Sequence, residues 1–249
     1  MQKYLGLAFA AMLASSFSAT AQQSSGAQDE KLILVELFTS QGCYSCPPAD
    51  KILEQMTQVD GILPLSLHVD YWDYLGWKDD FAIAKFGERQ ASYNAQIIKR
   101  GRRVTPQMVF NGVAEVAGGV GRSVEAINMT LETLKSHKEA ADIEIERNGR
   151  QIVMSLSTQT RGLGPADISL VRYTPAITVK IDRGENAGKT LTYHNVVRSL
   201  EIVDRWDTRK TKTLEVTLPE TKDAFAVIVQ GKRFGPVFVA RNLVVPGES

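Results

Sequence analysis

Cysteine is scarce in this sequence, and the few thiols are placed close together. The 249 residues include only two cysteines, Cys43 and Cys46. A disulfide between positions this close encloses a small loop, whereas structural disulfides stabilise most when they close long loops. A lack of surplus thiols also suits an exported protein, because oxidants outside the cytoplasm would mispair them. Thiol chemistry therefore explains the pair better than structural crosslinking does.

Other absences narrow the range of functions. The formal net charge is only +1, so no overall field favours nucleic acid or an anionic membrane. The sequence has no nicotinamide or flavin fingerprint, so we expect electrons to come from another protein or a small thiol. After residue 21, no apolar run approaches the roughly 20 residues needed to cross a bilayer. We therefore expect no membrane span in the mature chain.

The first 21 residues have the pattern of an export signal. Lys3 is their only charge, residues 5–13 are apolar, and residues 19–21 read Ala-Thr-Ala. This pattern predicts a cleavable secretory signal over residues 1–21, followed by a flexible leader over residues 22–30. A buried N-terminal helix is the alternative. The expected location is periplasmic or secreted.

The remaining chain divides near residue 138. Residues 31–138 contain strand-like and helix-like runs in the order β-α-β-α-β-β-α, which predicts an α/β domain with a central mixed sheet flanked by helices. Residues 139–249 contain short strand-like runs, among them residues 167–174 and 176–182, separated by turn residues, which predicts an all-β, sandwich-like domain. In the first region the expected strands cover residues 31–38, 62–72, 104–110 and 113–117, and the expected helices cover residues 49–59, 78–98 and 123–137.

The two cysteines lie between a buried strand and a helix. Cys46 starts the helix, and Pro47 and Pro48 occupy its first turn, where a missing N–H costs little. A helix N-terminus offers unpaired N–H groups and a partial positive charge, which favour thiolate over thiol. Thiolate is the species that attacks disulfides, so this placement predicts a redox-active pair.

Three segments resemble the thioredoxin superfamily. They are the strand at residues 32–38, the Cys43–Cys46 motif, and Thr105-Pro106 opening a strand that runs into the Asn111-Gly112 turn. The resemblance covers residues 31–137 and implies a thioredoxin-like domain. It also implies a cis Thr105-Pro106 bond lying against the cysteines, with the Thr105 backbone offered to an extended partner chain.

A closer resemblance rests on residues 36–43, 68–78 and 105–108. These segments look like a family of secreted thioredoxin-like proteins catalogued as domain of unknown function 1223, which implies no established substrate. The sequence departs from better-known thioredoxin branches at Tyr44-Ser45 and at Pro47-Pro48. The protein could therefore act as a reductant, an oxidant or an isomerase of disulfides, and the sequence leaves all three activities open.

The chemistry assigns different roles to the two thiols. We expect Cys43, nearer solvent, to attack and form a mixed disulfide, which Cys46 in the helix would resolve. The resemblance puts Glu36 near a buried acid that thioredoxin-like proteins use for proton transfer to the resolving thiol. A solvated, edge-facing Glu36 is the alternative.

Polar and aromatic residues follow the second expected strand. His68, Asp70 and Trp72 lie at its carboxyl end, the edge where open α/β sheets place their sites. They are candidates for a wall of the site, and ordinary packing with a hydrogen-bonded His68 is the alternative. The basic run at residues 99–103 leads toward Thr105 and would attract an acidic partner, or would be solvated surface.

The sequence therefore predicts an extracytoplasmic thiol–disulfide oxidoreductase that works through a mixed disulfide. Its substrates would be protein or small-thiol disulfides, with a separate redox partner protein and no cofactor besides the Cys43–Cys46 disulfide. One alternative is a secreted, non-catalytic binding protein on a thioredoxin-like scaffold. Another is a copper or zinc chaperone using the cysteines and His68, although the sequence has no second closely spaced ligand pair.

Overall fold

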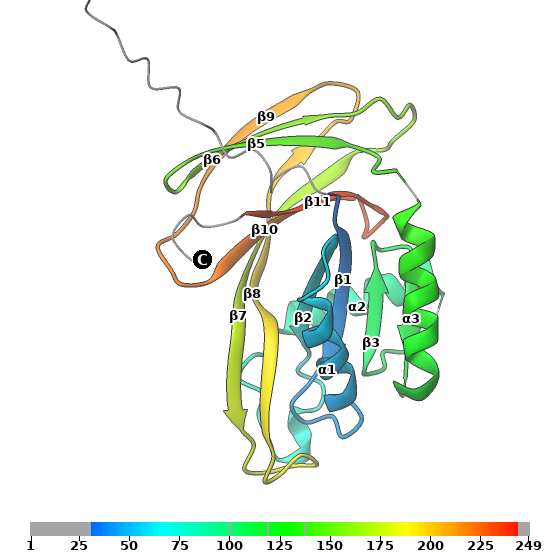
Figure 1. The fold of residues 1–249 in the computed structure, drawn as a ribbon, viewed down its shortest axis with the longest axis vertical. Helices are drawn as coiled ribbons and strands as arrows, with labels where there is room; N and C mark the ends of the chain where they lie inside the picture. The colour runs from blue at the N-terminus through cyan, green and yellow to red at the C-terminus, as the bar shows by residue number, and fades with distance from the viewer. Residues whose placement is uncertain (1–30, 100, 119, 137, 244–249) are drawn as a thin grey trace, which may run out of the picture.

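A mixed sheet of eight strands organises the molecule (Figure 1). The computed structural model describes residues 31–243 apart from residues 100, 119 and 137, so the expected signal peptide (1–21) and leader (22–30) lie outside the described residues. In spatial order the strands are β11 (Val237–Leu243), β10 (Ala224–Gly231), β7 (Ala166–Lys180), β8 (Thr190–Trp206), β2 (Ile62–His68), β1 (Ile33–Thr39), β3 (Gln107–Phe110) and β4 (Ala114–Ala117).

The strand β1 lies inside this sheet. It pairs in parallel with β2 and antiparallel with β3, and β3 pairs antiparallel with β4. Every residue of β1 is buried. A strand that is covered on both faces carries a nearly continuous apolar run, which is why residues 31–38 predict it correctly.

Helices cover both faces of this part of the sheet. They are α1 (Pro47–Met56), α2 (Ala84–Tyr93) and α3 (Val120–Lys135), with a 3-10 turn η1 (Asp73–Leu75) and a π-helical turn η2 (Asn94–Ile98). The helices α1 and α3 pack on the face of β1 that carries Val35 and Leu37, whereas α2 packs on the face that carries Phe38. Among the described residues, no helix has the length and apolar character needed to cross a membrane.

The helix expected over residues 78–98 begins later than predicted, at Ala84. The Asp79 carboxylate accepts a hydrogen bond from the Phe81 amide, and its backbone carbonyl accepts one from the Ala82 amide. An aspartate that binds the backbone two residues onward favours a turn over a helix. The helical pattern therefore takes hold only after this turn.

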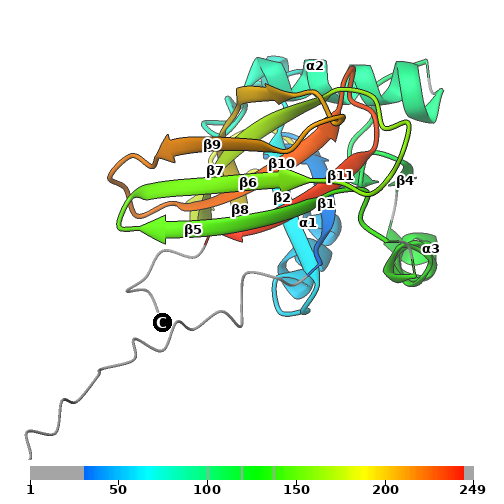
Figure 2. The same cartoon turned by 90° about the horizontal axis from the view of Figure 1, so that it is seen from above.

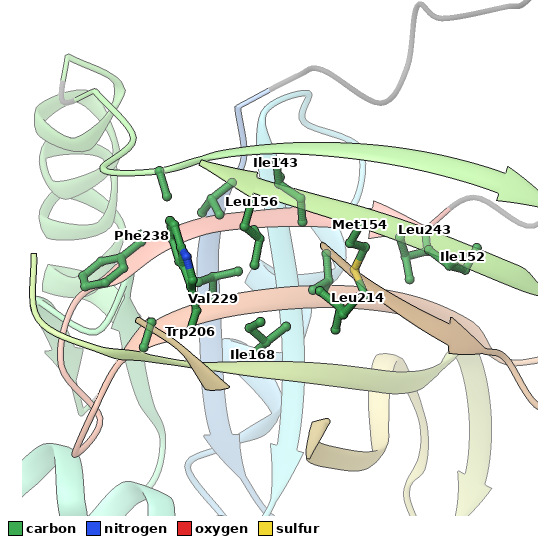
Figure 3. Close-up of a cluster of buried hydrophobic side chains, with 14 of the residues drawn as sticks. Ile143, Ile152, Met154, Leu156, Ile168, Trp206, Leu214, Val229, Phe238 and Leu243 are labelled. Atoms are coloured by element: carbon green, nitrogen blue, oxygen red, sulfur yellow. The ribbon is translucent and has the colours of Figure 1, made fainter. Parts of the chain in front are cut away.

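A second, antiparallel sheet lies across the C-terminal strands of the large sheet (Figure 2). Its strands are β5 (Asp142–Asn148), β6 (Gln151–Ser157) and β9 (Lys212–Thr217). Met154 and Leu214 of this sheet pack in one cluster with Ile168 and Val229 of the large sheet (Figure 3). Buried residues alternate with more exposed ones along β6, as expected for a strand with one covered face.

Strands from both sides of the expected boundary at residue 138 share the large sheet. The strands β7, β8, β10 and β11 all follow that boundary, yet β8 pairs in parallel with β2 where Val196 lies beside Ser66. The fold is therefore α/β, with one mixed sheet, flanking helices and an additional antiparallel sheet.

The strands β7 and β8 form a long hairpin. The neighbouring β10 pairs with β7 only as far as Tyr173, so the rest of β7 pairs with β8 alone. Two strands were expected here, at residues 167–174 and 176–182, but they form one continuous strand. Pro175 fits because β10 does not extend along the outer edge of β7 at that point. The hairpin tip, residues 181–189, lies at the same end of the molecule as the loops that follow β1 and β2 (Figure 1).

Candidate functional site

Cys43 and Cys46 form a disulfide in the loop between β1 and α1. Cys46 is the N-cap residue of α1, and its carbonyl oxygen accepts hydrogen bonds from the amides of Ala49 and Asp50. Pro47 takes the first helical position. The disulfide therefore lies at the positive end of the helix, where a thiolate would be stabilised.

The disulfide is not exposed. Cys43 and Cys46 are both 0% exposed, whereas Tyr44 between them is 69% exposed. The expectation that Cys43 lies nearer to solvent than Cys46 was therefore wrong, because both residues are fully buried. The burial of Cys43 is accompanied by contacts from distant segments, since the Thr105 hydroxyl reaches its sulfur and the Asn186 amide reaches its carbonyl oxygen.

Thr105 and Trp72 lie directly beside Cys43. Thr105 Oγ1 donates a hydrogen bond to Cys43 Sγ at 3.3 Å and accepts one from Trp72 Nε1 at 2.7 Å. The Thr105–Pro106 peptide bond is cis, as the resemblance implied. Pro106 is buried and lines a small cavity together with Ala49 of α1. The structure thus brings Thr105 of the expected substrate-binding pair and the expected wall residue Trp72 to the disulfide, while Pro106 lies against α1.

Glu36 has a different partner from the one expected. Side chains alternate along a strand, so Glu36 projects to the opposite face of β1 from Thr39. Its carboxylate accepts hydrogen bonds from Arg89 Nε at 2.6 Å and from the Tyr93 hydroxyl, and Arg89 also donates to Gln230 Oε1 at 2.9 Å. This buried ion pair joins β1, α2 and β10. The structure therefore gives Glu36 an arginine rather than a cysteine as its neighbour.

His68 and Asp79 form a buried pair that holds the start of the disulfide loop. His68 Nδ1 lies 2.7 Å from Asp79 Oδ2, and this same oxygen accepts the Gln41 amide at 2.8 Å. Burial raises the pKa of Asp79, but the charge and hydrogen bond of His68 and the two amide hydrogen bonds outweigh it, so the net shift is downward. His68 thus supports the backbone two residues before Cys43.

Asp70 belongs to a neighbouring surface cluster. Its carboxylate, the Tyr71 ring and the Arg103 guanidinium all lie within 4 Å of the position that a side chain would take at Gly87. The Arg103 guanidinium also lies 4.8 Å from the centre of the Tyr71 ring. Arg102 and Arg103 line a groove of about 520 Å³ beside that ring. Arg102 and Arg103 of the basic run therefore form a surface beside Tyr71.

Asp50 is a candidate that the sequence reasoning missed. It lies in the first turn of α1, four residues after Cys46, and is buried. Positions four apart on a helix face the same side, about 5–6 Å from each other. One carboxylate oxygen accepts a hydrogen bond from Thr39 Oγ1 at 2.8 Å, and the other, also buried, has no partner among the described residues.

The surroundings of Asp50 favour its neutral form. Burial raises the pKa of this carboxyl to about 7, against an ordinary 3.8. The charge of His68 and the Thr39 hydrogen bond oppose the rise, and the charge of Asp79 adds to it. Asp50 is therefore a group that can exchange a proton near neutral pH, one helical turn from Cys46.

A groove of about 400 Å³ connects this region with the surface. It lies between α1 and the start of β8, and its walls include Asp50, Glu54 and residues 190–194. The Tyr193 hydroxyl is buried without a partner among the described residues. Burial, with the charges of Asp50 and Asp79, raises the pKa of Tyr193. The sequence signal for this region was the position of Asp50 in the first turn of a helix. Acidic residues are common at helix starts for electrostatic reasons alone, so this signal does not single out Asp50.

The described part of the chain contains no group of three or more histidine, cysteine, aspartate or glutamate side chains arranged to hold a metal ion. The Asp50 carboxylate accepts a hydrogen bond from the Thr39 hydroxyl instead. The Asp79 carboxylate contacts the His68 imidazole and the backbone amide of Gln41. These groups form a buried polar cluster beside the disulfide, and Asp50 is the member whose pKa is raised toward neutral pH.

Comparison with solved structures gives an extensive match. A crystal structure of a protein from Agrobacterium tumefaciens shares 30% sequence identity and a TM-score of 0.71, covering 90% of this chain and 98% of that one. A hypothetical protein from Pyrococcus horikoshii matches with 11% identity and a TM-score of only 0.21, over 45% of this chain and 90% of that one. None of the curated proteins matches. A family described as protein of unknown function (DUF1223) matches residues 34–230, and the chain belongs to this family.

Proposed function

We propose that this protein is an extracytoplasmic thiol–disulfide oxidoreductase. The observation that carries the proposal is a disulfide at the N-terminus of α1 with the buried, half-partnered Asp50 carboxyl one turn after Cys46. A structural crosslink has no need of a proton acceptor, whereas a dithiol that cycles must release and take up protons.

The proposed scaffold is thioredoxin-like over residues 31–138. Its support is the parallel β1–β2 pair joined through α1, followed by the antiparallel β3–β4 pair and α3. For residues 139–249 we propose a second unit in which the three-stranded sheet and the C-terminal strands form a sandwich-like pair of layers. Its support is the shared apolar cluster between them.

In the reducing direction, the Cys43 thiolate attacks one sulfur of a substrate disulfide and expels the other as a thiolate. The Cys46 thiol then gives its proton to the Asp50 carboxylate and attacks Cys43 Sγ. That step breaks the mixed disulfide, releases the second substrate thiolate and restores the Cys43–Cys46 bond. Two electrons thus pass from the protein dithiol to the substrate, and the reverse sequence oxidises a substrate dithiol.

Asp50 takes in this proposal the role that the resemblance suggested for Glu36. Thr105 lies against Cys43 and would stabilise its thiolate by hydrogen bonding, while its backbone would receive an extended substrate chain. The substrates proposed are protein or small-thiol disulfides, recharged by a separate redox protein. Export would depend on residues 1–21.

Trapping of the mixed disulfide tests the proposal. Cys46→Ser should accumulate a covalent adduct with a model disulfide peptide, because the resolving thiol is gone, while Cys43→Ser should form none. A Cys43→Ser protein that still reduces the peptide at the full rate would refute the assignment. Mass spectrometry of the quenched reaction distinguishes these outcomes.

The burial of both sulfurs favours a second candidate, a non-catalytic binding protein with a permanently closed disulfide. The reduction potential separates the two. A value between about −120 and −270 mV fits an exchanging pair, whereas resistance to reduction below about −300 mV fits a structural one. Equilibration in thiol buffers followed by alkylation measures it.

A further inference from the structure

The tip of the β7–β8 hairpin binds the backbone of the disulfide loop. Asn186 is 0% exposed, and its amide donates hydrogen bonds to the carbonyl oxygens of Gln41 and Cys43, each at 2.9 Å. Its own side-chain oxygen accepts a hydrogen bond from Lys189 Nζ at 2.8 Å. Both amide hydrogens and the oxygen of this side chain are therefore hydrogen-bonded, although Asn186 lies 143 residues from Cys43 in the sequence.

Neighbouring tip residues contact the same loop. Glu185 Oε2 accepts a hydrogen bond from the Tyr44 amide at 3.1 Å. The ammonium of Lys189 lies 5.1 Å from the centre of the Tyr44 ring. In the segment that follows β2, Trp77 donates a hydrogen bond to Gln41 of the disulfide loop, and Gly184 lies so close to Trp77 that an added Cβ would be 3.2 Å from the Cβ of that tryptophan. The tip thus binds the disulfide loop at residues before and after Cys43.

The tip has its own internal hydrogen bonds. The Ile181 amide donates to the Lys189 carbonyl at 2.9 Å, and the Gly188 amide donates to the Ile181 carbonyl at 2.8 Å. Gly184 and Gly188 adopt φ values of 78° and 80°, which suit glycine. The arm that carries the tip extends beyond the stretch of β7 that pairs with β10, and apolar side chains of the arm pack against Phe81.

Disulfide exchange requires a sulfur to approach Cys43 Sγ along the line of the disulfide bond, and the closed structure leaves no such access. We propose that the hairpin tip is a latch over the disulfide, and that Asn186 is the positioning residue that holds it shut. With the latch closed, the disulfide is shielded; release of the Gln41 and Cys43 carbonyls frees the loop and exposes Cys43. The physiological use of the latch rests on the proposed oxidoreductase function, but the latch itself does not.

Reduction by tris(2-carboxyethyl)phosphine tests access to the disulfide alone. The phosphine attacks one sulfur and breaks the disulfide, and water then supplies the oxygen of the phosphine oxide and the protons of the two thiols. If opening precedes attack, the observed rate is proportional to the open population. Loss of two hydrogen bonds in Asn186→Ala should raise that rate about 30-fold, the equivalent of about 2 kcal/mol.

Two further variants keep the test decisive. Glu185→Ala removes an exposed acceptor and should raise the rate about 5-fold, which converts to about 1 kcal/mol. Thr178→Ala is the matched control, because it removes an exposed hydroxyl contact with Thr192 higher in the same hairpin and should leave the rate unchanged. Circular dichroism and the melting temperature establish that each variant is folded. If Asn186→Ala does not fold, Glu185→Ala decides the question.

Wild-type rates in folded Asn186→Ala and Glu185→Ala would overturn the latch. A similar acceleration in Thr178→Ala would also overturn it, since general loosening of the hairpin would then be the cause. The outcome is separate from the fate of the proposed function. Faster phosphine reduction combined with no adduct in the Cys46→Ser trapping experiment would support the latch and refute the oxidoreductase.

Discussion

The ionisation of Asp50 makes a prediction about stability that can be worked out from its surroundings. Its carboxyl has a pKa of about 7 in the folded protein, against 3.8 ordinarily. Between these two values the folded protein keeps a proton that the unfolded chain has already released. Rising pH therefore favours the unfolded chain across this window, and the stability fully present below pH 3.8 is lost as pH rises to about 7. The loss amounts to about 4 kcal/mol.

Asp50→Asn removes this ionisation and keeps an oxygen that can accept the Thr39 hydroxyl. The new amide group would lack a partner in the place of the unpaired oxygen, at a cost of about 1 kcal/mol. The oxidised variant should therefore be about 3 kcal/mol more stable than the wild type at pH 8 and no more stable at pH 4. Urea unfolding at a series of pH values measures both. The neighbouring His68, Asp79 and Tyr193 are present in both proteins, so the difference isolates Asp50.

The same substitution should impair the chemistry. A positioned base contributes about 100-fold or more to a proton transfer, so Asp50→Asn should slow resolution of the mixed disulfide about 100-fold at pH 7. Rapid quenching of a single turnover measures this step. Glu54→Gln is the matched control, because Glu54 lines the same groove from the same helix but is paired with Lys51 at its outer edge. The reasoning would be refuted if Asp50→Asn showed the same dependence of unfolding free energy on pH as the wild type and resolved the mixed disulfide at the wild-type rate.

Three other substitutions have defined outcomes. Arg89→Met should cost about 3–5 kcal/mol in urea unfolding, because Glu36 would be left buried without its partner, and wild-type stability would show that the pair is dispensable. Thr105→Val should raise the pKa of the Cys43 thiol in the reduced protein, seen as an alkylation profile moved to higher pH; an unmoved profile would mean that the hydroxyl does not contact the thiolate. The pKa of Asp79 is lowered overall, so its contribution to stability is present above pH 3.8 and is lost in acid. Asp79→Asn should accordingly destabilise the protein at pH 7 and make little difference at pH 2, and equal losses at both would contradict this.

Local patterns predicted the part of the fold that surrounds the disulfide. The apolar run at residues 31–38 identifies β1 because both faces of that strand are covered. The Cys46-Pro47 start of α1 follows from helix-terminus chemistry. Such features depend only on residues within a few positions of one another, so they can be predicted from a single sequence.

Contacts between distant segments were not predictable in the same way. The strand β8 joins the sheet beside β2 through the facing pair of Ser66 and Val196, which lie far apart in the chain and form no recognisable pattern. The resemblance placed Glu36 near the thiols, and nothing nearby in the sequence marks Arg89 as its partner. Asp50 has the appearance of an ordinary acidic residue at a helix start, and only the packing of other elements makes it a proton-exchanging group.

One hairpin contributes to both parts of the site. Its tip holds the Cys43 carbonyl through Asn186, and the residues that follow the tip, 190–194, form a wall of the groove beside Asp50. Opening of the latch should therefore also admit water to the carboxyl, which favours its charged form and lowers its pKa. Asn186→Ala should then weaken the pH dependence of stability between pH 4 and 7, relative to Thr178→Ala. An unaltered pH dependence in a variant with accelerated phosphine reduction would mean that access to the sulfur and hydration of the acid are independent.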